Sequence, residues 1–306
     1  MSHFTPNVQH SGGMMLRARI SSMLIALAIC GVACATHRSA AATPDRIVAI
    51  GDLHGDLDNA LATLRLAGIV DDSGKWAAGS TTLVQTGDVT DRGPDSKAIL
   101  DLLQRLKAEA KNAGGRVVPL LGNHEVMNMQ GDNRYVHPGD YTSFGGADAR
   151  AQAFDVDGPY GSRLAKQDIV AKVGDAIFTH GGVHPTFASM GVDGINDAWH
   201  AALRGGDAAV IGNAGPLWYR GFVQDPEPAA CALLAESLDK LGAKRMVVGH
   251  TTRRNGKIES RCGGALQVID TGISDHYGGN LAAWEWSNGD ARAIYPSGPV
   301  DLEDPP

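Results

Sequence analysis

The first 42 residues contain no aspartate or glutamate, although acidic residues outnumber basic ones in the 306-residue chain. Their apolar run, Met23 to Ala35, has 13 residues, whereas a transmembrane helix needs roughly 20. Arg17 and Arg19 precede the run and Ala-x-Ala patterns follow it, which is typical of a secretory signal peptide. We therefore expect residues 1–42 to be a signal peptide, with no stable membrane span in a mature protein that is periplasmic or secreted.

Alternatives for this segment are an uncleaved anchor, a mitochondrial-type presequence, and a lipoprotein signal at Cys30 or Cys34, whose preceding residues fit a lipobox poorly. The chain has only four cysteines, and cleavage near residue 42 would leave Cys231 and Cys262. An exported protein with two cysteines is expected to pair them, and two free thiols are the alternative.

The chain has no excess of positive charge, because its formal net charge is −7. This balance argues against a nucleic-acid partner, which would normally require a basic surface. A 43% hydrophobic and 20% charged composition excludes a disordered or coiled-coil chain. No internal repeat or linker follows residue 43, so we expect one catalytic domain over 43–306, with a short Pro-rich acidic tail after about residue 296.

One local pattern recurs along this domain, a short apolar strand that runs into a polar turn, usually with glycine. The expected strands are Arg46–Ile50, Thr82–Thr86, Val117–Leu121, Ala176–Thr179 and Arg245–Val248. Helices are expected over Asp58–Leu66 and Ser96–Ala110, the second because its leucines recur at spacings of three and four. This is an α/β pattern, and it predicts that the polar side chains line one edge of a sheet. The less regular stretch 128–167 is expected to form a rim around the site.

The turns carry a specific set of motifs. In chain order they are GDLHG at 51–55, GDVTDRG at 87–93, GNHE at 122–125, HGG at 180–182 and GHT at 249–251. Carboxylate oxygen together with imidazole nitrogen suits manganese, iron or zinc better than calcium. Six candidate ligands are too many for one tetrahedral ion and suit two ions that share a carboxylate: Asp52, His54, Asp88, Asn123, His180 and His250.

These motifs closely resemble those of the calcineurin-like metallophosphoesterases, within them the phosphoprotein phosphatase family. The segment GPLWYRG at 215–221 and VVGHT at 247–251 resemble the bacterial-type Shewanella-like protein phosphatase branch. The resemblance covers 45–296 and implies a four-layered α-β-β-α sandwich. It also implies two divalent metal ions, with manganese expected and iron or zinc as alternatives.

The resemblance further implies a role for each site residue. Asp52, His54 and His250 would hold one metal, Asp88 would bridge, and Asn123 with His180 would complete the other. His124 would be the general acid that protonates the leaving oxygen, and Asp91 would orient it. Arg92 and Arg220 would bind the phosphate oxygens.

The expected function is therefore that of a two-metal phosphomonoesterase, a protein phosphatase for phosphoserine, phosphothreonine or phosphotyrosine in proteins or peptides. Phosphate would be released by direct attack of metal-activated hydroxide. The alternatives are a nucleotide or dinucleoside polyphosphate hydrolase, and a non-catalytic metal- or phosphate-binding module. Glu125 is expected to satisfy backbone groups, Asp270 to support His250 or cap a turn, and Tyr277 to lie in a loop or line the pocket.

Overall fold

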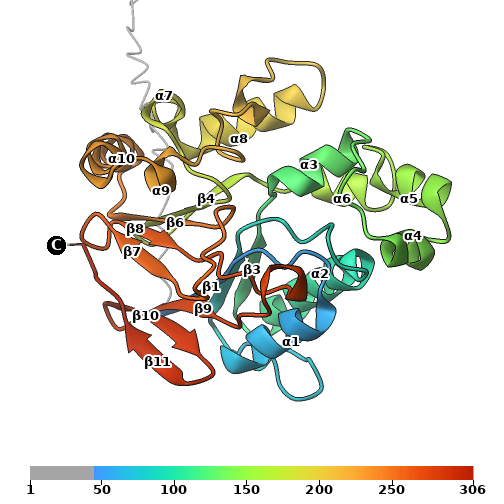
Figure 1. The fold of residues 1–306 in the computed structure, drawn as a ribbon, viewed down its shortest axis with the longest axis horizontal. Coiled ribbons are helices and arrows are strands. Elements are labelled where there is room, and N and C mark those ends of the chain that lie inside the picture. The colour runs from blue at the N-terminus through green and yellow to red at the C-terminus, as the bar shows by residue number, and fades with distance from the viewer. Residues whose placement is uncertain (1–44, 306) are drawn as a thin grey trace, which may run out of the picture. The chain divides into compact units, whose positions relative to one another are not determined.

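The computed structural model describes residues 45–305, so the signal peptide expected over 1–42 lies outside the described residues. The described chain contains two β-sheets (Figure 1). The strand order of the first sheet is β11 (Gly298–Asp301), β10 (Asp290–Tyr295), β9 (Ala283–Ser287), β1 (Arg46–Ile50), β2 (Thr82–Gln85) and β3 (Arg116–Pro119). Here β1, β2 and β3 are parallel, while β9, β10 and β11 continue the sheet as antiparallel strands.

The second sheet has five strands. Their order is β4 (Val170–Val173), β5 (Ala176–Thr179), β6 (Arg245–Val248), β8 (Leu266–Val268) and β7 (Glu259–Arg261). The central strands β5, β6 and β8 run parallel, and β4 and β7 pair antiparallel at the two edges. Gly174 and Asp175 form the turn of the β4–β5 hairpin.

Alternation along the strands explains how the two sheets are layered. Successive side chains of a strand point to opposite faces of its sheet. In β1, Ile47 and Ala49 belong to a buried cluster that also contains Phe178 and Trp284, from β5 and β9. Val48 and Ile50 belong instead to the cluster that the helices share. One face of the sheet therefore packs on the other sheet, and the opposite face packs on helices.

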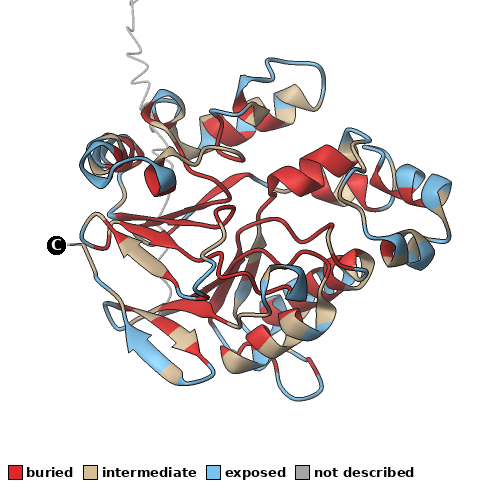
Figure 2. Ribbon diagram, in the orientation of Figure 1, coloured by how far each residue is buried: buried red, intermediate tan, exposed pale blue. Residues whose placement is uncertain are grey.

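The helices of the domain cover the outer faces of both sheets, except for those between residues 123 and 164, which group together to one side (Figures 1 and 2). They are α1 (Leu57–Leu66), α2 (Ser96–Asn112), α3 (Asn123–Met129), α4 (Pro138–Phe144), α5 (Ala147–Phe154), α6 (Gly161–Leu164), α7 (Pro185–Ala188), α8 (Gly191–Ala202), α9 (Gly221–Gln224) and α10 (Glu227–Leu241), with short 3-10 turns η1 (Ala209–Ile211) and η2 (Asp275–Tyr277). Helices α1 and α2 pack on the first sheet, and α8 packs on the second. This is the expected four-layered α-β-β-α sandwich.

Helix α2 shows how the sequence determines this packing. Its buried positions include Ile99, Leu103 and Leu106, which lie on one face at spacings of three and four. Helix α1 starts one residue before the expected position, and its N-cap Asp56 accepts a hydrogen bond from the Asn59 amide. The helices expected from periodicity therefore form, with ends that differ by two residues or fewer.

Three expectations need correction. The polar turns do not line the edge of one sheet, because β5 and β6 belong to a different sheet from β1, β2 and β3. Strand β3 covers Arg116–Pro119 rather than 117–121. The segment expected as a tail forms β11, and Asp304 beyond it forms an ion pair with Arg245 of β6. The acidic end is therefore fixed to both sheets by strand pairing and by charge.

The stretch 128–167 contains the end of α3 and the helices α4, α5 and α6. None of the described helices combines the length and the apolar character that crossing a bilayer requires. A disulfide joins Cys231 of α10 to Cys262, which follows β7, with 5.4 Å between their Cα atoms. The expected pairing of the two cysteines is thus confirmed.

Removal of this disulfide should destabilise the domain. The bridge closes a loop with a sequence separation of 31 residues, and the chain-entropy model gives about 3–4 kcal/mol for such a loop. We expect the double variant Cys231→Ser/Cys262→Ser to lose roughly that much free energy of unfolding, measured by urea titration with circular dichroism. Reductant should shift the midpoint of the wild type and leave that of the double variant in place. Equal midpoints for both oxidised proteins would contradict the prediction.

Candidate metal centre

The candidate site lies where the carboxyl ends of strands from both sheets meet. Asp52 and His54 follow β1, Asp88 follows β2, Asn123 starts α3 after β3, and the two further histidines, His180 and His250, follow β5 and β6. All six side chains are buried. The structure therefore brings together every residue that the sequence analysis proposed as a metal ligand.

The backbone at the site is unusual. The described chain has seven non-glycine residues with positive φ, and five of them belong to the motifs: His54, Asp88, Asp91, Arg92 and His250. Residues with a side chain rarely adopt this conformation, and it costs of order 1–3 kcal/mol at each position. Such strain is concentrated where side chains must point in directions that a regular loop does not allow.

Four atoms with lone pairs converge at one position in the site. The Nε2 atom of His180 lies 3.0 Å from Asn123 Oδ1, 3.1 Å from Asp88 Oδ2 and 3.0 Å from His250 Nδ1. The other ring nitrogens face backbone carbonyls, His180 Nδ1 at 2.9 Å from Thr86 O and His250 Nε2 at 3.2 Å from Trp218 O. In the state that binds a metal, each ring would carry its proton on the outer nitrogen and leave the inner nitrogen free as a ligand.

With these tautomers, no proton lies between the four converging atoms. Two imidazole lone pairs, a carboxylate oxygen and an amide oxygen would repel one another unless a cation separates them. This donor set of nitrogen and oxygen atoms fits a divalent transition-metal ion. The residues present therefore fit a bound metal at this position.

A second group of donors lies on the other side of Asp88. His54 Nδ1 faces Thr90 O at 3.1 Å, so its Nε2 carries the lone pair. That Nε2 lies 3.9 Å from Asp52 Oδ2 and 3.7 Å from Asp88 Oδ2. The sequence analysis grouped His250 with Asp52 and His54, whereas the geometry groups its Nδ1 with His180 and Asp88. This correction leaves Asp88 as the carboxylate common to both groups.

Burial determines the protonation of these groups. It lowers the pKa of His54 to about 3, and with the nearby His180 and Arg220 it holds the pKa of His250 well below its usual value. Burial raises the pKa of Asp88, but the surrounding imidazoles outweigh this effect and keep that pKa well below its usual value. Both histidines are therefore neutral and Asp88 is ionised, which are the states that bind metal.

His124 is held differently from the other three histidines of the motifs. Its Nδ1 lies 2.6 Å from the carboxylate of Asp91, and its Nε2 points into the site, 3.8 Å from Asp88 Oδ2. Burial lowers the pKa of His124, but the charge of Asp88 and the hydrogen bond that Nδ1 donates to Asp91 outweigh it and raise that pKa. This geometry suits a group that donates a proton from Nε2.

Sequence reasoning missed the network behind Asp91. Asn128 donates a hydrogen bond to Asp91 Oδ1 at 3.0 Å, and the amide oxygen of Asn128 accepts one from Arg150 at 2.6 Å. Arg150 is 1% exposed and also pairs with Asp140 at 2.7 Å. Helices α4 and α5 therefore fix the partner of His124. The only sequence signal was a charged residue on the apolar side of a short helix.

Glu125 has the structural role that was expected. Its carboxylate accepts hydrogen bonds from the backbone N–H groups of Asp88, Val89, Thr90 and Gly122 at 2.8–2.9 Å. The carboxylate thereby ties the loop after β2 to the start of α3. Asp270 accepts a hydrogen bond from the Gly272 amide at 3.1 Å and so caps a turn. This was one of the two roles expected for it.

The mouth of the site is a cavity of about 220 Å³ with two arginines and three aromatic side chains in its wall. The guanidinium of Arg92 lies 3.9 Å from the ring centre of Tyr135. Arg220 donates hydrogen bonds to His250 O at 2.5 Å and to Thr251 Oγ1 at 3.2 Å. Tyr277 stacks near His54, and Trp218 completes the wall. The mouth is thus positively charged and aromatic.

Three of the four other histidines of the domain lie elsewhere, whereas His276 contacts Tyr277 at the mouth, with ring centres 4.7 Å apart. His137 and His184 cap α4 and α7 through their ring nitrogens. His200 lies 3.1 Å from the Ala165 carbonyl. Among the described residues, none of these three belongs to a cluster of potential metal ligands that is centred on Asp88.

Comparisons with known proteins agree with this geometry. The family model described as calcineurin-like phosphoesterase matches residues 45–254. Shewanella-like protein phosphatase 2 of Arabidopsis thaliana is 36% identical, over 76% of this chain and 72% of its own. An uncharacterized protein of Schizosaccharomyces pombe is 38% identical, over 82% of this chain and 80% of its own. The crystal structure of a cold-active protein-tyrosine phosphatase from a psychrophilic Shewanella species superposes with a TM-score of 0.75, at 27% identity, over 85% of this chain and 81% of that one.

A substitution at Gly249 tests the metal centre without replacing any of the proposed ligand residues. A Cβ atom at this position would overlap the Asp52 carboxylate and lie 2.9 Å from Thr86 Oγ1. We expect Gly249→Ala to weaken the binding of divalent cations about 10–100-fold, the usual effect of disturbing what supports a ligand. Isothermal titration with Mn²⁺ would measure this change. Gly212→Ala is the control, because the nearest atom to its Cβ would be 3.3 Å away. Equal affinities in the two variants would contradict the prediction.

Proposed function

The chain belongs to the calcineurin-like phosphoesterases, which are metal-dependent phosphoester hydrolases, and on this basis we propose that it is an exported two-metal protein phosphatase that prefers phosphotyrosine. The observation that carries the proposal is the His124–Asp91 pair directly beside converging metal donors. This combination places a proton donor next to a site for charged phosphate oxygens.

The two groups of donors would each hold one ion. Asp52, His54 and Asp88 would form one set, and the second set would use Asp88 again together with Asn123, His180 and His250. When bound, divalent cations supply positive charge that stabilises phosphoryl oxygens and lowers the pKa of water. Manganese is the metal we propose, with iron or zinc as alternatives, because the donors combine imidazole nitrogen with carboxylate oxygen.

Side chains of the protein would donate the proton and bind the phosphoryl oxygens. His124 Nε2 would give its proton to the oxygen that leaves with the alcohol or phenol, and Asp91 would keep the imidazole in position and stabilise its charge. Arg92 and Arg220 would bind phosphoryl oxygens at the mouth of the site. Arg220 is fixed for this role by the carbonyl of His250.

The preference for phosphotyrosine rests on the wall of the mouth. Tyr135, Trp218 and Tyr277 line the mouth of the site, and their rings would contact the ring of a phosphorylated tyrosine. A solved relative at 27% identity is a protein-tyrosine phosphatase, and curated relatives are named protein phosphatases. A nucleotide substrate could also stack on these rings and is the competing candidate.

Export to the periplasm or beyond is proposed from two features of the sequence. The N-terminal 42 residues have basic, apolar and small-residue regions in the order of a signal peptide. The disulfide between Cys231 and Cys262 suits an oxidising compartment. Mass spectrometry of the protein from its native host should find a mature N-terminus between Ala35 and Ala42.

Metal analysis tests the two-ion proposal. Active protein should contain close to two ions per chain, because two donor groups share Asp88. Chelation should abolish activity, and Mn²⁺ should restore it better than Ca²⁺. Asp88→Ala should lose most of the bound metal together with its activity. Full turnover by metal-stripped protein would refute the proposal.

Substitution of His124 tests the proton donor. General acid catalysis is typically worth about 10²–10⁴-fold, so His124→Asn should reduce kcat on a phosphotyrosine peptide by a factor in that range. The loss on p-nitrophenyl phosphate should be smaller, because nitrophenolate leaves without needing a proton. Metal content should stay unchanged. Equal losses on both substrates would assign His124 to positioning the phosphate, and loss of metal would make it a ligand.

A substrate panel tests the class of substrate. Phosphotyrosine, phosphoserine and phosphothreonine peptides of one sequence should be compared with mononucleotides and diadenosine tetraphosphate. We expect kcat/KM for phosphotyrosine to be at least about tenfold the others, since an aromatic contact contributes about 0.5–1.5 kcal/mol and several are available. Tyr277→Ala should remove much of this preference while phosphoserine turnover changes little. A mononucleotide or diadenosine tetraphosphate as the best substrate would support the competing candidate.

A further inference from the structure

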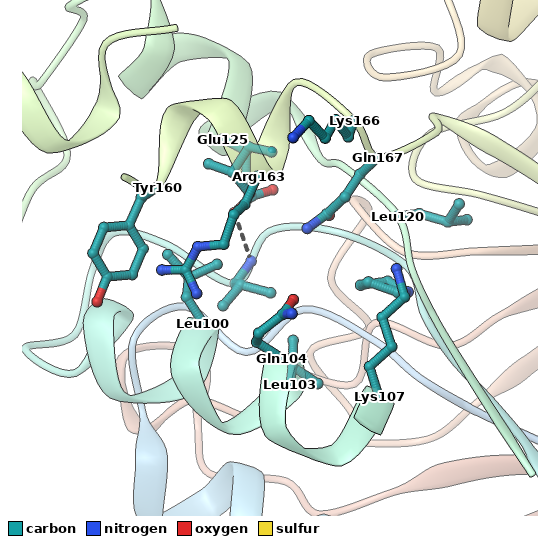
Figure 3. A pocket seen from close by; sticks show the side chains of 13 residues that line it. Leu100, Leu103, Gln104, Lys107, Leu120, Glu125, Tyr160, Arg163, Lys166 and Gln167 are labelled. Carbon is teal, nitrogen blue, oxygen red and sulfur yellow. Dashed lines mark hydrogen bonds between the residues drawn. The ribbon is translucent and has the colours of Figure 1, made fainter. Parts of the chain in front are cut away.

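A second cavity lies apart from the metal centre. Its volume is about 270 Å³, and it is bounded by α2, the residues after β3 and the region of α6 (Figure 3). It shares no lining residue with the mouth of the metal centre. Pockets of this size accommodate molecules at the small end of the usual ligand range.

The inner walls of this cavity are apolar. Leu100 and Leu103 of α2 form one wall, Leu164 of α6 another, and Pro119 and Leu120 a third. An alkyl or aryl group placed here would be removed from water on several sides, at roughly 25 cal/mol for each Å² of apolar surface buried. The cavity therefore favours a ligand with an apolar body.

The rim, in contrast, is cationic. Lys107 and Lys166 lie at the rim, and in the described chain no hydrogen bond or ion pair engages either ammonium group. Arg163 is already occupied, since it contacts Asp101 at 3.3 Å and the Pro159 carbonyl at 2.9 Å. Two unpaired positive charges beside an apolar wall favour an anionic group on the ligand.

Two amides supply hydrogen-bonding groups between the charges and the apolar wall. Gln104 of α2 and Gln167 face each other across the cavity (Figure 3). In the described part of the chain neither side-chain amide forms a hydrogen bond. A carboxylate between the two lysines could therefore accept hydrogen bonds from amide N–H groups as well as from the ammonium groups.

The far wall belongs to the loop that carries Asp88. Val89 lines the cavity, and its backbone N–H donates to the carboxylate of Glu125 at 2.8 Å. Glu125, the residue that ties this loop to α3, lines the cavity as well. A molecule in this cavity would thus contact the back of the metal-site loop without entering the metal centre.

We propose that the cavity between α2 and α6 binds a small amphiphilic carboxylate, with its apolar chain against Leu100, Leu103 and Leu164 and its carboxylate between Lys107 and Lys166. This assignment does not depend on which phosphoester the metal centre hydrolyses. It requires both halves of the ligand, because the apolar wall and the charged rim are adjacent parts of one cavity.

Octanoate is a suitable probe for the full-length protein, with ligand-observed saturation-transfer NMR as the measurement. We expect saturable binding of octanoate. Octanamide, which has the same chain without the charge, should bind about tenfold more weakly, and propionate, which has the charge without the chain, should not bind detectably. Equal affinity for octanoate and octanamide would overturn the proposal.

Charge reversal at the rim tests whether octanoate binds in this cavity and not elsewhere on the protein. Lys107→Glu/Lys166→Glu should weaken octanoate binding at least about tenfold, while circular dichroism stays unchanged because both side chains are exposed. Lys111→Glu is the matched control, one helical turn along α2 and outside the lining of this cavity, and should bind as the wild type does. Unchanged binding in the double variant would refute the site.

Inorganic phosphate and a chelator provide the last controls. Octanoate should be displaced from the rim lysines only by a large excess of phosphate, whereas removal of metal with a chelator should leave its binding in place, because the cavity lining includes none of the metal donors. Loss of octanoate binding when the metal is removed would locate the binding in the metal centre and overturn the proposal.

Discussion

Mutual repulsion between buried lone pairs is the constraint on which the rest of the site depends. His180 Nε2 lies 3.0 Å from His250 Nδ1 and 3.1 Å from Asp88 Oδ2, and in the deprotonated state that binds metal these atoms present only lone pairs to one another. A folded chain without cations must overcome this repulsion, and a bound cation converts it into attraction. In the metal-free protein, the favourable packing of the sandwich must therefore offset the repulsion between the donors.

The surrounding backbone is arranged to maintain this convergence. Asp88 and His250 adopt positive φ, a backbone conformation that residues with side chains rarely adopt. Asp52 accepts hydrogen bonds from the His250 amide at 3.1–3.2 Å, so loops from the two sheets are joined directly at the donors. Glycine is required at Gly122 and Gly249 because a Cβ atom at either position would overlap a donor carboxylate. The glycines of the motifs are thus as necessary to the site as the charged residues are.

Sequence reasoning succeeded where one local rule determined the outcome. Five of the strands followed from apolar runs that lead into polar turns, the helix α2 followed from apolar spacing, and the six donors followed from their positions after strands. It failed where the outcome depended on contacts distant in sequence. The division into two sheets, the ion pair of Asp304 with Arg245 and the position of Arg150 beside Asp91 all depend on residues tens of positions apart. The grouping of His250 failed for the same reason, because which nitrogen faces the metal is decided by the distant Trp218 carbonyl.

The same principle supports the two roles that we propose, metal binding for His54 and proton donation for His124. His54 and His124 are neighbours, with ring centres 4.9 Å apart, and each directs Nε2 toward Asp88. They differ in what holds Nδ1. His54 faces a neutral carbonyl, which fixes the tautomer without stabilising a positive ring, and its pKa falls to about 3. His124 faces a carboxylate, which stabilises the imidazolium, and its pKa rises. A neutral ring offers a lone pair to a metal, and a protonated ring offers a proton. The group that accepts the hydrogen bond from Nδ1 would therefore decide what Nε2 does in each ring.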